Sequence, residues 1–379
     1  MTRYRDLGLS VGQLPPGPLN AITDVDGVTV GMTTLIEGDG PLEVGRGPVR
    51  TGVTVVVPRE DIGSQCVFAG CHRLNGNGEL TGLEWIREAG MLSTPIAITN
   101  THSVGVVRDA LVSAEVRDVG AGPAFWSLPV VGETYDGALN DINGFHVRPE
   151  HLLHALDGAA GGPVPEGAVG GGTGMVCHEF KGGTGTASRR LPDDAGGWTV
   201  AALVQANHGR RPRLAVDGVP VGREITTLDV PSPWDEERAL AQERPEAGAG
   251  SIIVVLATDA PLLPHQCERL AQRASLGVAR VGGGGEHSSG DLFVAFSTGN
   301  RGKLPNHKVE TGRDTIEVAM AGDGGMSDLF WGAIEATEEA ILNALVAART
   351  MTGRDGITAH ALDHERLIDI MSRYGRGPR

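Results

Sequence analysis

The sequence is poor in aromatic residues and shows no cysteine pairing pattern. Aromatic side chains make up 4% of the 379 residues, which argues against stacking platforms for bases or sugars. The four cysteines (Cys66, Cys71, Cys177 and Cys267) show no CxxC spacing, so we expect neither a zinc ribbon nor a disulfide scaffold. Idle thiols in a reducing cytoplasm are the simplest interpretation.

Positive charge and long apolar runs are scarce as well. The chain carries 32 Lys and Arg against 47 Asp and Glu, and its net charge of −15 has the wrong sign for a nucleic-acid-binding protein. The apolar run at 251–257 is far too short to span a membrane. The first twenty residues lack the apolar region of a secretory signal. We therefore expect a cytoplasmic protein that binds neither nucleic acid nor membrane.

Glycine and short apolar runs are abundant. The 57 glycines predict many tight turns and close backbone approaches, and 40% apolar with 21% charged residues is normal for a globular enzyme. Runs rich in Val and Ile predict strands at 51–58, 94–100, 197–207, 251–258, 291–298 and 315–321. Helical patterns occur at 79–90, after His102, and at 149–156, 262–275 and 329–350. This mixture predicts an α/β (or α+β) sandwich, with strands covered on both faces.

One segment, 230–250, breaks this pattern. It combines prolines, clustered charges and a small-residue end (VPSPWDEERALAQERPEAGAG), so it cannot bury much and should be exposed and flexible. It runs directly into Ser251 and a strand that looks buried. A linker should be flexible on both sides, so this boundary is better interpreted as a processing site.

Ser251 opens a predicted core strand, where the sheet would hold it rigidly. Cleavage of the Gly250–Ser251 bond would free an α-amino group with a pKa of about 8, close enough to the hydroxyl to act as its general base. Before cleavage, the same hydroxyl could attack the Gly250 carbonyl in an N-to-O acyl shift, because glycine has no side chain to shield it. Gly-Ser is a common dipeptide, however, and Gly63–Ser64 is another.

Three other polar elements could complete such a site. Ser288, Ser289 and Asp291 lead into a predicted strand, where a hydroxyl beside a carboxylate could relay a proton; a capped turn would look the same. Asn207 ends another strand and could donate to an oxyanion, or simply form a turn. The polar loop at 132–147 either lines a pocket or lies in solvent. In a pocket it could offer a carboxylate for a substrate ammonium and the hydroxyl of Tyr135 to support the oxyanion.

Nucleotide and metal sites are not indicated. Glycine runs such as 170–174 and 282–285 come without GxxxxGK[ST], and no GxGxxG with a following acidic residue occurs between a strand and a helix. The twelve histidines include no HExxH. His151 and His154 are spaced i, i+3 without a third ligand nearby, which predicts a surface helix. We expect no metal and no cofactor.

Taken together, seven elements resemble the DmpA/BapA family of self-processing L-aminopeptidase/D-esterases and β-peptidyl aminopeptidases. They cover essentially the whole chain: ITDVDGVTVG (22–31), AGCHRLNGNGELTGLEWI (69–86), ITNTHSVG (98–105), ETYDGALND (133–141), GGGTGMVCHEFKGGTGTASR (170–189), the Gly250–Ser251 junction and SSGDLFVAFSTGN (288–300). The resemblance implies a four-layer αββα sandwich, similar to N-terminal-nucleophile hydrolases but with a distinct topology. It also implies one catalytic domain over 1–379, cut into subunits 1–250 and 251–379 that stay together, usually in a homo-oligomer such as a tetramer.

The resemblance further implies roles for individual residues. Ser251 matches the nucleophile, and Ser289 and Asp291 match its relay partners, although some members have Glu at the position of Asp291. Asn207 matches the oxyanion-hole amide, and Tyr135 lies near it.

Glu133 matches a carboxylate that holds the substrate amine. The implied activity is metal-independent release of an N-terminal amino acid (a small L-, D- or β-residue) from peptides, amides or esters, through an acyl-enzyme on Ser251. The alternatives are a related oligoamide hydrolase, an acyl-transferring enzyme of the same fold, and an uncleaved, non-catalytic ligand-binding protein. A denaturing gel separates the last from the rest, because only self-processing gives two bands.

Overall fold

Two β-sheets form the centre of the molecule. The computed structural model describes residues 1–118, 125–235, 250–306 and 315–378. The larger sheet has the strand order β4-β3-β12-β11-β10-β9, and the smaller one β1-β2-β5-β6. The strands of the larger sheet are β3 (Val67–Arg73), β4 (Met91–Leu92), β9 (Gly183–Arg190), β10 (Thr199–Asn207), β11 (Ser251–Thr258) and β12 (Asp291–Ser297). Those of the smaller sheet are β1 (Thr29–Glu37), β2 (Val49–Val57), β5 (Ile96–Asn100) and β6 (Val130–Thr134).

Helices cover the outer faces of both sheets, and two short hairpins complete the chain. The helices are α1 (Leu83–Ala89), α2 (Val104–Asp118), α3 (Pro149–Asp157), α4 (Val221–Glu224), α6 (Pro264–Arg280), α7 (Met326–Ala347) and α8 (His364–Arg373). The hairpins pair β7 (Val176–Cys177) with β8 (Phe180–Lys181), and β13 (Met351–Thr352) with β14 (Thr358–Ala359). Within the described ranges, none of the helices is long and apolar enough to cross a membrane.

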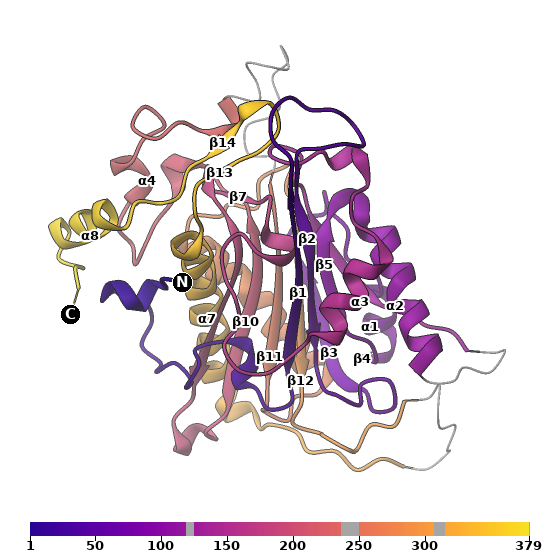
Figure 1. Cartoon of the computed structure of the whole chain (residues 1–379). Coiled ribbons are helices and arrows are strands. Elements are labelled where there is room, and N and C mark those ends of the chain that lie inside the picture. The colour runs from indigo at the N-terminus through magenta and orange to yellow at the C-terminus, as the bar shows by residue number, and fades with distance from the viewer. Residues whose placement is uncertain (119–124, 236–249, 307–314, 379) are drawn as a thin grey trace.

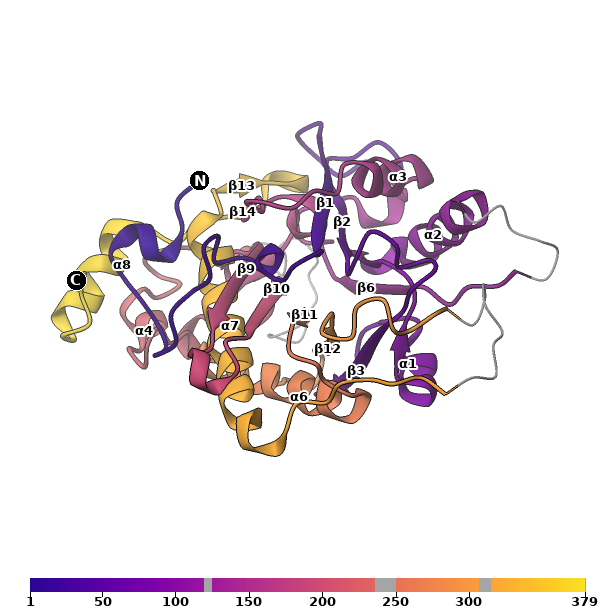
Figure 2. The same cartoon turned by 90° about the horizontal axis from the view of Figure 1, so that it is seen from below.

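Three apolar clusters hold four layers together. One lies between the larger sheet and the helices α6 and α7, a second lies between the two sheets, and a third lies between the smaller sheet and the helices α2 and α3. Figure 1 shows α7 on one side of the strands and α2 with α3 on the other, and Figure 2 shows α6 beside α7. The order helix, sheet, sheet, helix confirms the predicted αββα sandwich.

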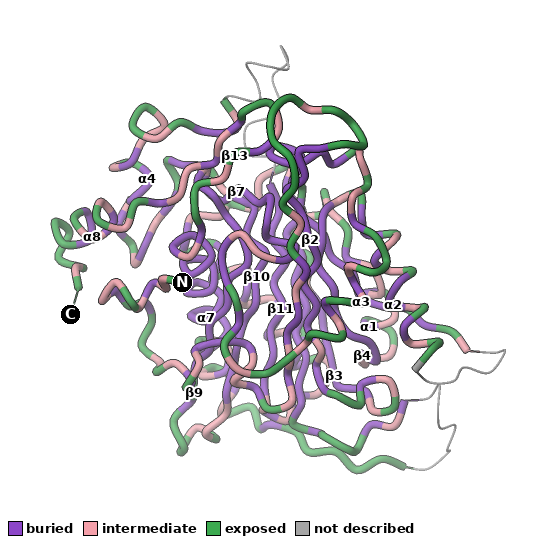
Figure 3. Tube along the Cα trace, in the orientation of Figure 1, coloured by how far each residue is buried: buried purple, intermediate pink, exposed green. Residues whose placement is uncertain are grey.

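The unbroken apolar runs of the central strands follow from this arrangement. In β11, Ile252 and Val254 join the cluster beneath α6 and α7, whereas Ile253 and Val255 face the second sheet. Because successive side chains of a strand point to opposite faces, a strand between two cores needs an apolar residue at every position. The prediction that these strands are covered on both faces is confirmed, and Figure 3 shows them buried.

The strand predicted at 315–321 is wrong. Residues 315–320 have no regular secondary structure, and Ile316, Val318 and Met320 remain 46%, 37% and 54% exposed. Strand propensity expresses packing against neighbouring side chains more than a backbone preference, and this segment lies at the surface. The other five predicted strands are present as β2, β5, β10, β11 and β12, and the five predicted helices as α1, α2, α3, α6 and α7.

Candidate active site

Ser251 lies where three strands of the larger sheet end together. It is the first residue of β11 and pairs with Asn207, the last residue of the antiparallel strand β10. On the other side β11 runs parallel to β12, and Ile252 pairs with Asp291. The sheet therefore brings Ser251 and Asn207 beside the segment Ser289–Asp291, although they are distant in the sequence.

Ser251, Ser289 and Asp291 each take part in a hydrogen bond. The backbone N–H of Gly290 donates to the hydroxyl oxygen of Ser251 at 3.0 Å. The hydroxyl of Ser289 donates to Oδ1 of Asp291 at 2.6 Å. All three side chains belong to buried residues, Ser251 being 5% exposed. The hydroxyl–carboxylate pair predicted from the sequence thus exists and lies next to Ser251.

Asp291 is a buried carboxyl group. Burial raises its pKa to about 6, and the hydrogen bond from Ser289 opposes that rise. A second residue fixes its backbone: Oδ1 of Asn75 accepts the N–H of Asp291 at 2.6 Å, and Nδ2 of Asn75 donates to the carbonyl of Glu286 at 2.9 Å. Asn75 lies inside the motif at 69–86, but sequence reasoning did not single it out.

The side-chain amide of Asn207 is oriented at both ends. Its oxygen accepts the N–H of Val176 at 2.7 Å, and its nitrogen donates to the carbonyl of Tyr135 at 2.9 Å. An amide nitrogen carries two hydrogens, so the second hydrogen can serve an oxyanion. Asn207 pairs with Ser251 across the β10–β11 ladder, so its amide is a candidate donor for an oxyanion formed at Ser251.

Tyr135 is close to Asn207 through its backbone. Its side chain is 37% exposed, and its ring lies over Gly137, where an added Cβ would be 2.4 Å from the hydroxyl oxygen. The contact with Asn207 is therefore made by the carbonyl of Tyr135. The hydroxyl role implied for this residue stays a prediction.

Glu133 lies at the end of β6, in the smaller sheet, and is 3% exposed. Oε1 accepts the N–H of Glu79 at 3.0 Å, and Oε2 accepts the hydroxyl of Thr101. A Cβ placed on Gly78 would lie 3.1 Å from both Oε1 of Glu133 and the Cα of Gly290, so this carboxylate and the catalytic segment face each other across Gly78. Burial raises the pKa of Glu133, and the two hydrogen bonds oppose the rise.

Gly250 precedes Ser251 at a position that has no room for a side chain. It is buried, and a Cβ on it would lie 2.2 Å from the carbonyl oxygen of Asn207 and 3.0 Å from the Cα of His208. Such a contact is well inside van der Waals distance. Of the segment 230–250, predicted to be exposed and flexible, residues 236–249 lie outside the described residues. The prediction is wrong for Ser232, Pro233 and Gly250, which are buried.

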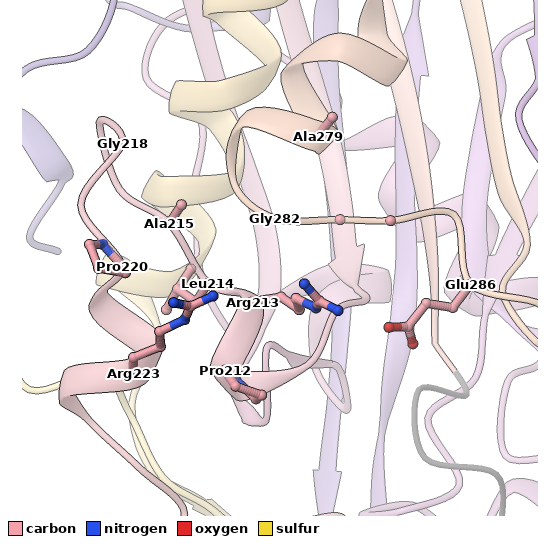
Figure 4. Close-up of a pocket in the computed structure, with 12 residues that line it drawn as sticks. Pro212, Arg213, Leu214, Ala215, Gly218, Pro220, Arg223, Ala279, Gly282 and Glu286 are labelled. Atoms are coloured by element: carbon pink, nitrogen blue, oxygen red, sulfur yellow. The ribbon is translucent and has the colours of Figure 1, made fainter.

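Glycines of the segment 282–285 line two cavities. A small one is lined by Ser289, Asp291 and His208 together with glycines of this segment. A larger, open one of about 690 Å³ is lined by twelve residues, among them Arg213, Arg223 and Glu286. Figure 4 shows Arg213 and Glu286 pointing toward one another across it. The glycine segment thus lines both cavities, next to the Ser289–Asp291 pair.

Comparisons with known proteins agree with this geometry. The family model described as "Peptidase family S58" matches residues 20–359. The chain is 52% identical to the β-peptidyl aminopeptidase BapA of Sphingosinicella microcystinivorans, covering 99% of this chain and 93% of that protein. It superposes on a Burkholderia sp. β-aminopeptidase with a TM-score of 0.89 at 55% sequence identity. It superposes on the L-aminopeptidase D-Ala-esterase/amidase of Ochrobactrum anthropi with a TM-score of 0.88 at 45% sequence identity. Both superpositions cover 99% of each chain. The Ochrobactrum anthropi protein is described as a variant of the Ntn hydrolase fold.

Proposed function

This chain belongs to peptidase family S58, and we propose that it is a self-processing serine aminopeptidase whose mature nucleophile is Ser251. The observation that carries the proposal is the Ser251 hydroxyl held by the Gly290 N–H, with the Ser289–Asp291 pair beside it. Neighbours named as aminopeptidases share the fold at up to 55% identity, which supports the hydrolase activity.

Self-processing would begin at the Gly250 carbonyl. The Ser251 hydroxyl attacks this carbon, the peptide nitrogen leaves as the α-amine of Ser251, and an ester joins the two residues. Water then hydrolyses the ester, which leaves chains 1–250 and 251–379. The close packing of Gly250 against the Asn207 carbonyl supports this step, because it fixes the junction against the sheet.

Substrate hydrolysis would reuse the same groups. The new α-amine of Ser251 takes the hydroxyl proton, or passes it on through Ser289 and Asp291, while the oxygen attacks the substrate carbonyl. The Asn207 amide and the Gly290 N–H stabilise the oxyanion. The leaving amine receives the proton, and water releases the acid from the acyl-enzyme.

The carboxylate of Glu133 would bind the substrate's free amine. Glu133 is buried and lies across Gly78 from Gly290. This arrangement supports a substrate in which one amino acid spans the distance from the amine bound by Glu133 to the carbonyl attacked by Ser251. Together with the two β-aminopeptidase neighbours, this supports β-amino acid or small L- or D-residues as the released group. We further propose a cytoplasmic homo-oligomer, a tetramer, built from both chains.

Intact mass under denaturing conditions tests the proposal. We expect two species meeting at Gly250–Ser251, and a single inactive species for Ser251→Ala. An aged, folded wild-type protein that stays uncut, or a cut and active Ser251→Ala variant, would refute it.

Two glycine-to-alanine variants, one at Gly250 and a control at Gly63, test whether processing depends on the packing before Ser251. Gly250→Ala should slow processing by about 100-fold or more, because the new methyl group displaces the junction. Gly63→Ala changes the other Gly-Ser dipeptide, where a Cβ meets nothing within 4 Å, and it should process at the wild-type rate. Equal rates for the two variants would contradict the proposed role of the close packing at Gly250.

A further inference from the structure

A buried group of metal-binding side chains lies behind the Asn207 amide and takes no part in the mechanism above. It consists of Cys177, His178 and His208, and one ligand atom of each lies within 4.8 Å of those of the other two. The sulfur of Cys177 is 3.9 Å from Nδ1 of His208. Around a tetrahedral zinc ion with ordinary Zn–S and Zn–N bonds, ligand atoms are about 3.5 Å apart, so small side-chain rotations would close the site.

Two nitrogens of this group are buried without a hydrogen-bond partner: Nε2 of His178 and Nε2 of His208. Nδ1 of His178 lies 3.1 Å from the carbonyl oxygen of Arg210. A carbonyl only accepts, so Nδ1 carries the proton and the lone pair of the neutral ring is on Nε2. The unpaired buried lone pair on Nε2 of His178 is unfavourable, and coordination to a cation would satisfy it. In His208, the nitrogen next to the sulfur of Cys177 is Nδ1.

The backbone around His178 is unusual. The β7–β8 hairpin turns through His178 and Glu179, whose φ angles are 48° and 64°. Asn and Gly are the residues that favour such a two-residue turn, so its geometry alone does not explain a histidine here. The N–H of His178 also donates to the carbonyl of His208 at 2.7 Å, which ties the two histidine-bearing segments together before any ion binds.

We propose that Cys177, His178 and His208 bind one thiophilic divalent cation, with Zn²⁺ as the representative. The thiol of Cys177 releases its proton to solvent as the metal–sulfur bond forms, and each imidazole supplies a lone pair. Thiolate and imidazole favour Zn²⁺ and its neighbours, whereas Mg²⁺ and Ca²⁺ favour oxygen, so neither of those should bind here. Of the three side chains, His208 also lines the small cavity that it shares with Gly283 and Gly285.

The test is metal binding by the purified, chelator-stripped protein. After incubation with Zn²⁺ and gel filtration, we expect about one zinc per chain by elemental analysis. Replacing zinc with Co²⁺ should give the near-ultraviolet charge-transfer band of a cobalt–thiolate bond. Cys177→Ser should lose both signals, whereas Cys267→Ser, which removes another fully buried thiol, should keep them.

Two outcomes overturn the proposal. One is wild-type protein that retains no zinc or shows no cobalt–thiolate band, a result that does not depend on how any variant folds. The other is Cys177→Ser that binds zinc as well as the wild type does. Both measurements are made without substrate, so they stand whether or not the protein processes itself.

Discussion

Replacing Asp291 by asparagine should make the protein more stable at pH 8 while it removes activity. Burial raises the pKa of this carboxyl from 3.8 to about 6. The folded state therefore binds the proton more tightly than the unfolded state does. The stability that this tighter proton binding contributes is present in full below pH 4, and it is lost as the pH rises through about 6. At pH 8 both states are ionised, and the loss amounts to about 3 kcal/mol.

Asparagine removes that loss but weakens one hydrogen bond. Its oxygen can still accept the Ser289 hydroxyl, although a neutral acceptor is worth about 1 kcal/mol less than a carboxylate. We expect the free energy of unfolding to rise by about 2 kcal/mol at pH 8. At pH 4 the carboxyl is protonated, so the gain should disappear.

The measurement needs a background in which processing cannot differ. Asp291→Asn is therefore made in the Ser251→Ala protein, so that both chains stay uncut, and thermal or urea unfolding is followed from pH 4 to pH 8. Asp194→Asn, at an exposed position, is the control for the chemical change alone. Other buried carboxyls such as Asp136 are common to both proteins and cancel. A variant that is less stable than its parent at pH 8, or a difference that does not vary with pH, would refute the reasoning.

Three further predictions concern catalysis. The value of kcat/KM should fall about tenfold per pH unit below pH 6, where Asp291 is protonated and its relay is lost; a pH-rate profile that stays flat from pH 5 to 8 would remove Asp291 from the relay. Glu133→Gln should raise KM for free-amine substrates by about 30-fold or more and leave N-acylated esters nearly unaffected, so an equal loss for both classes would remove the amine-binding role. Asn207→Ala should lower kcat by about 100-fold with little change in KM; this is measured on protein already cut, and an unchanged kcat would exclude the amide from the oxyanion hole.

The sequence predicts the central strands well because each lies between two apolar cores. An unbroken run such as 251–258 is visible without knowing which strands are its neighbours. The strands that it misses include β1, β3, β6 and β9, and β9 reads GTGTASRR. Arg189 of β9 is fully buried against Glu335 and Glu339 of α7, and a charged residue that is buried with partners cannot be distinguished in the sequence from an exposed one.

For the candidate site, too, the sequence locates individual residues but does not show which of them are neighbours. Ser251, Asn207 and Asp291 each stand at the end of an apolar run, so the sequence locates them. Their adjacency depends on the order β12-β11-β10, which no local pattern encodes. The supporting residues Asn75 and Thr101 lie outside the strands, and only the folded chain shows that Asn75 holds the backbone of Asp291 and Thr101 the carboxylate of Glu133.

The sheet order also explains why cleavage would leave one particle. β11 and β12 follow the Gly250–Ser251 bond, and they form the middle of the larger sheet. Their neighbours on both sides, β10 and β3, precede it. The helix α7, from the second piece, covers β9 and β10 of the first. Separating the pieces would break the β10–β11 and β12–β3 ladders and expose the apolar cluster beneath α7. Cutting the single peptide bond before Ser251 breaks neither, so it can free the α-amine without unfolding the sheet that holds it.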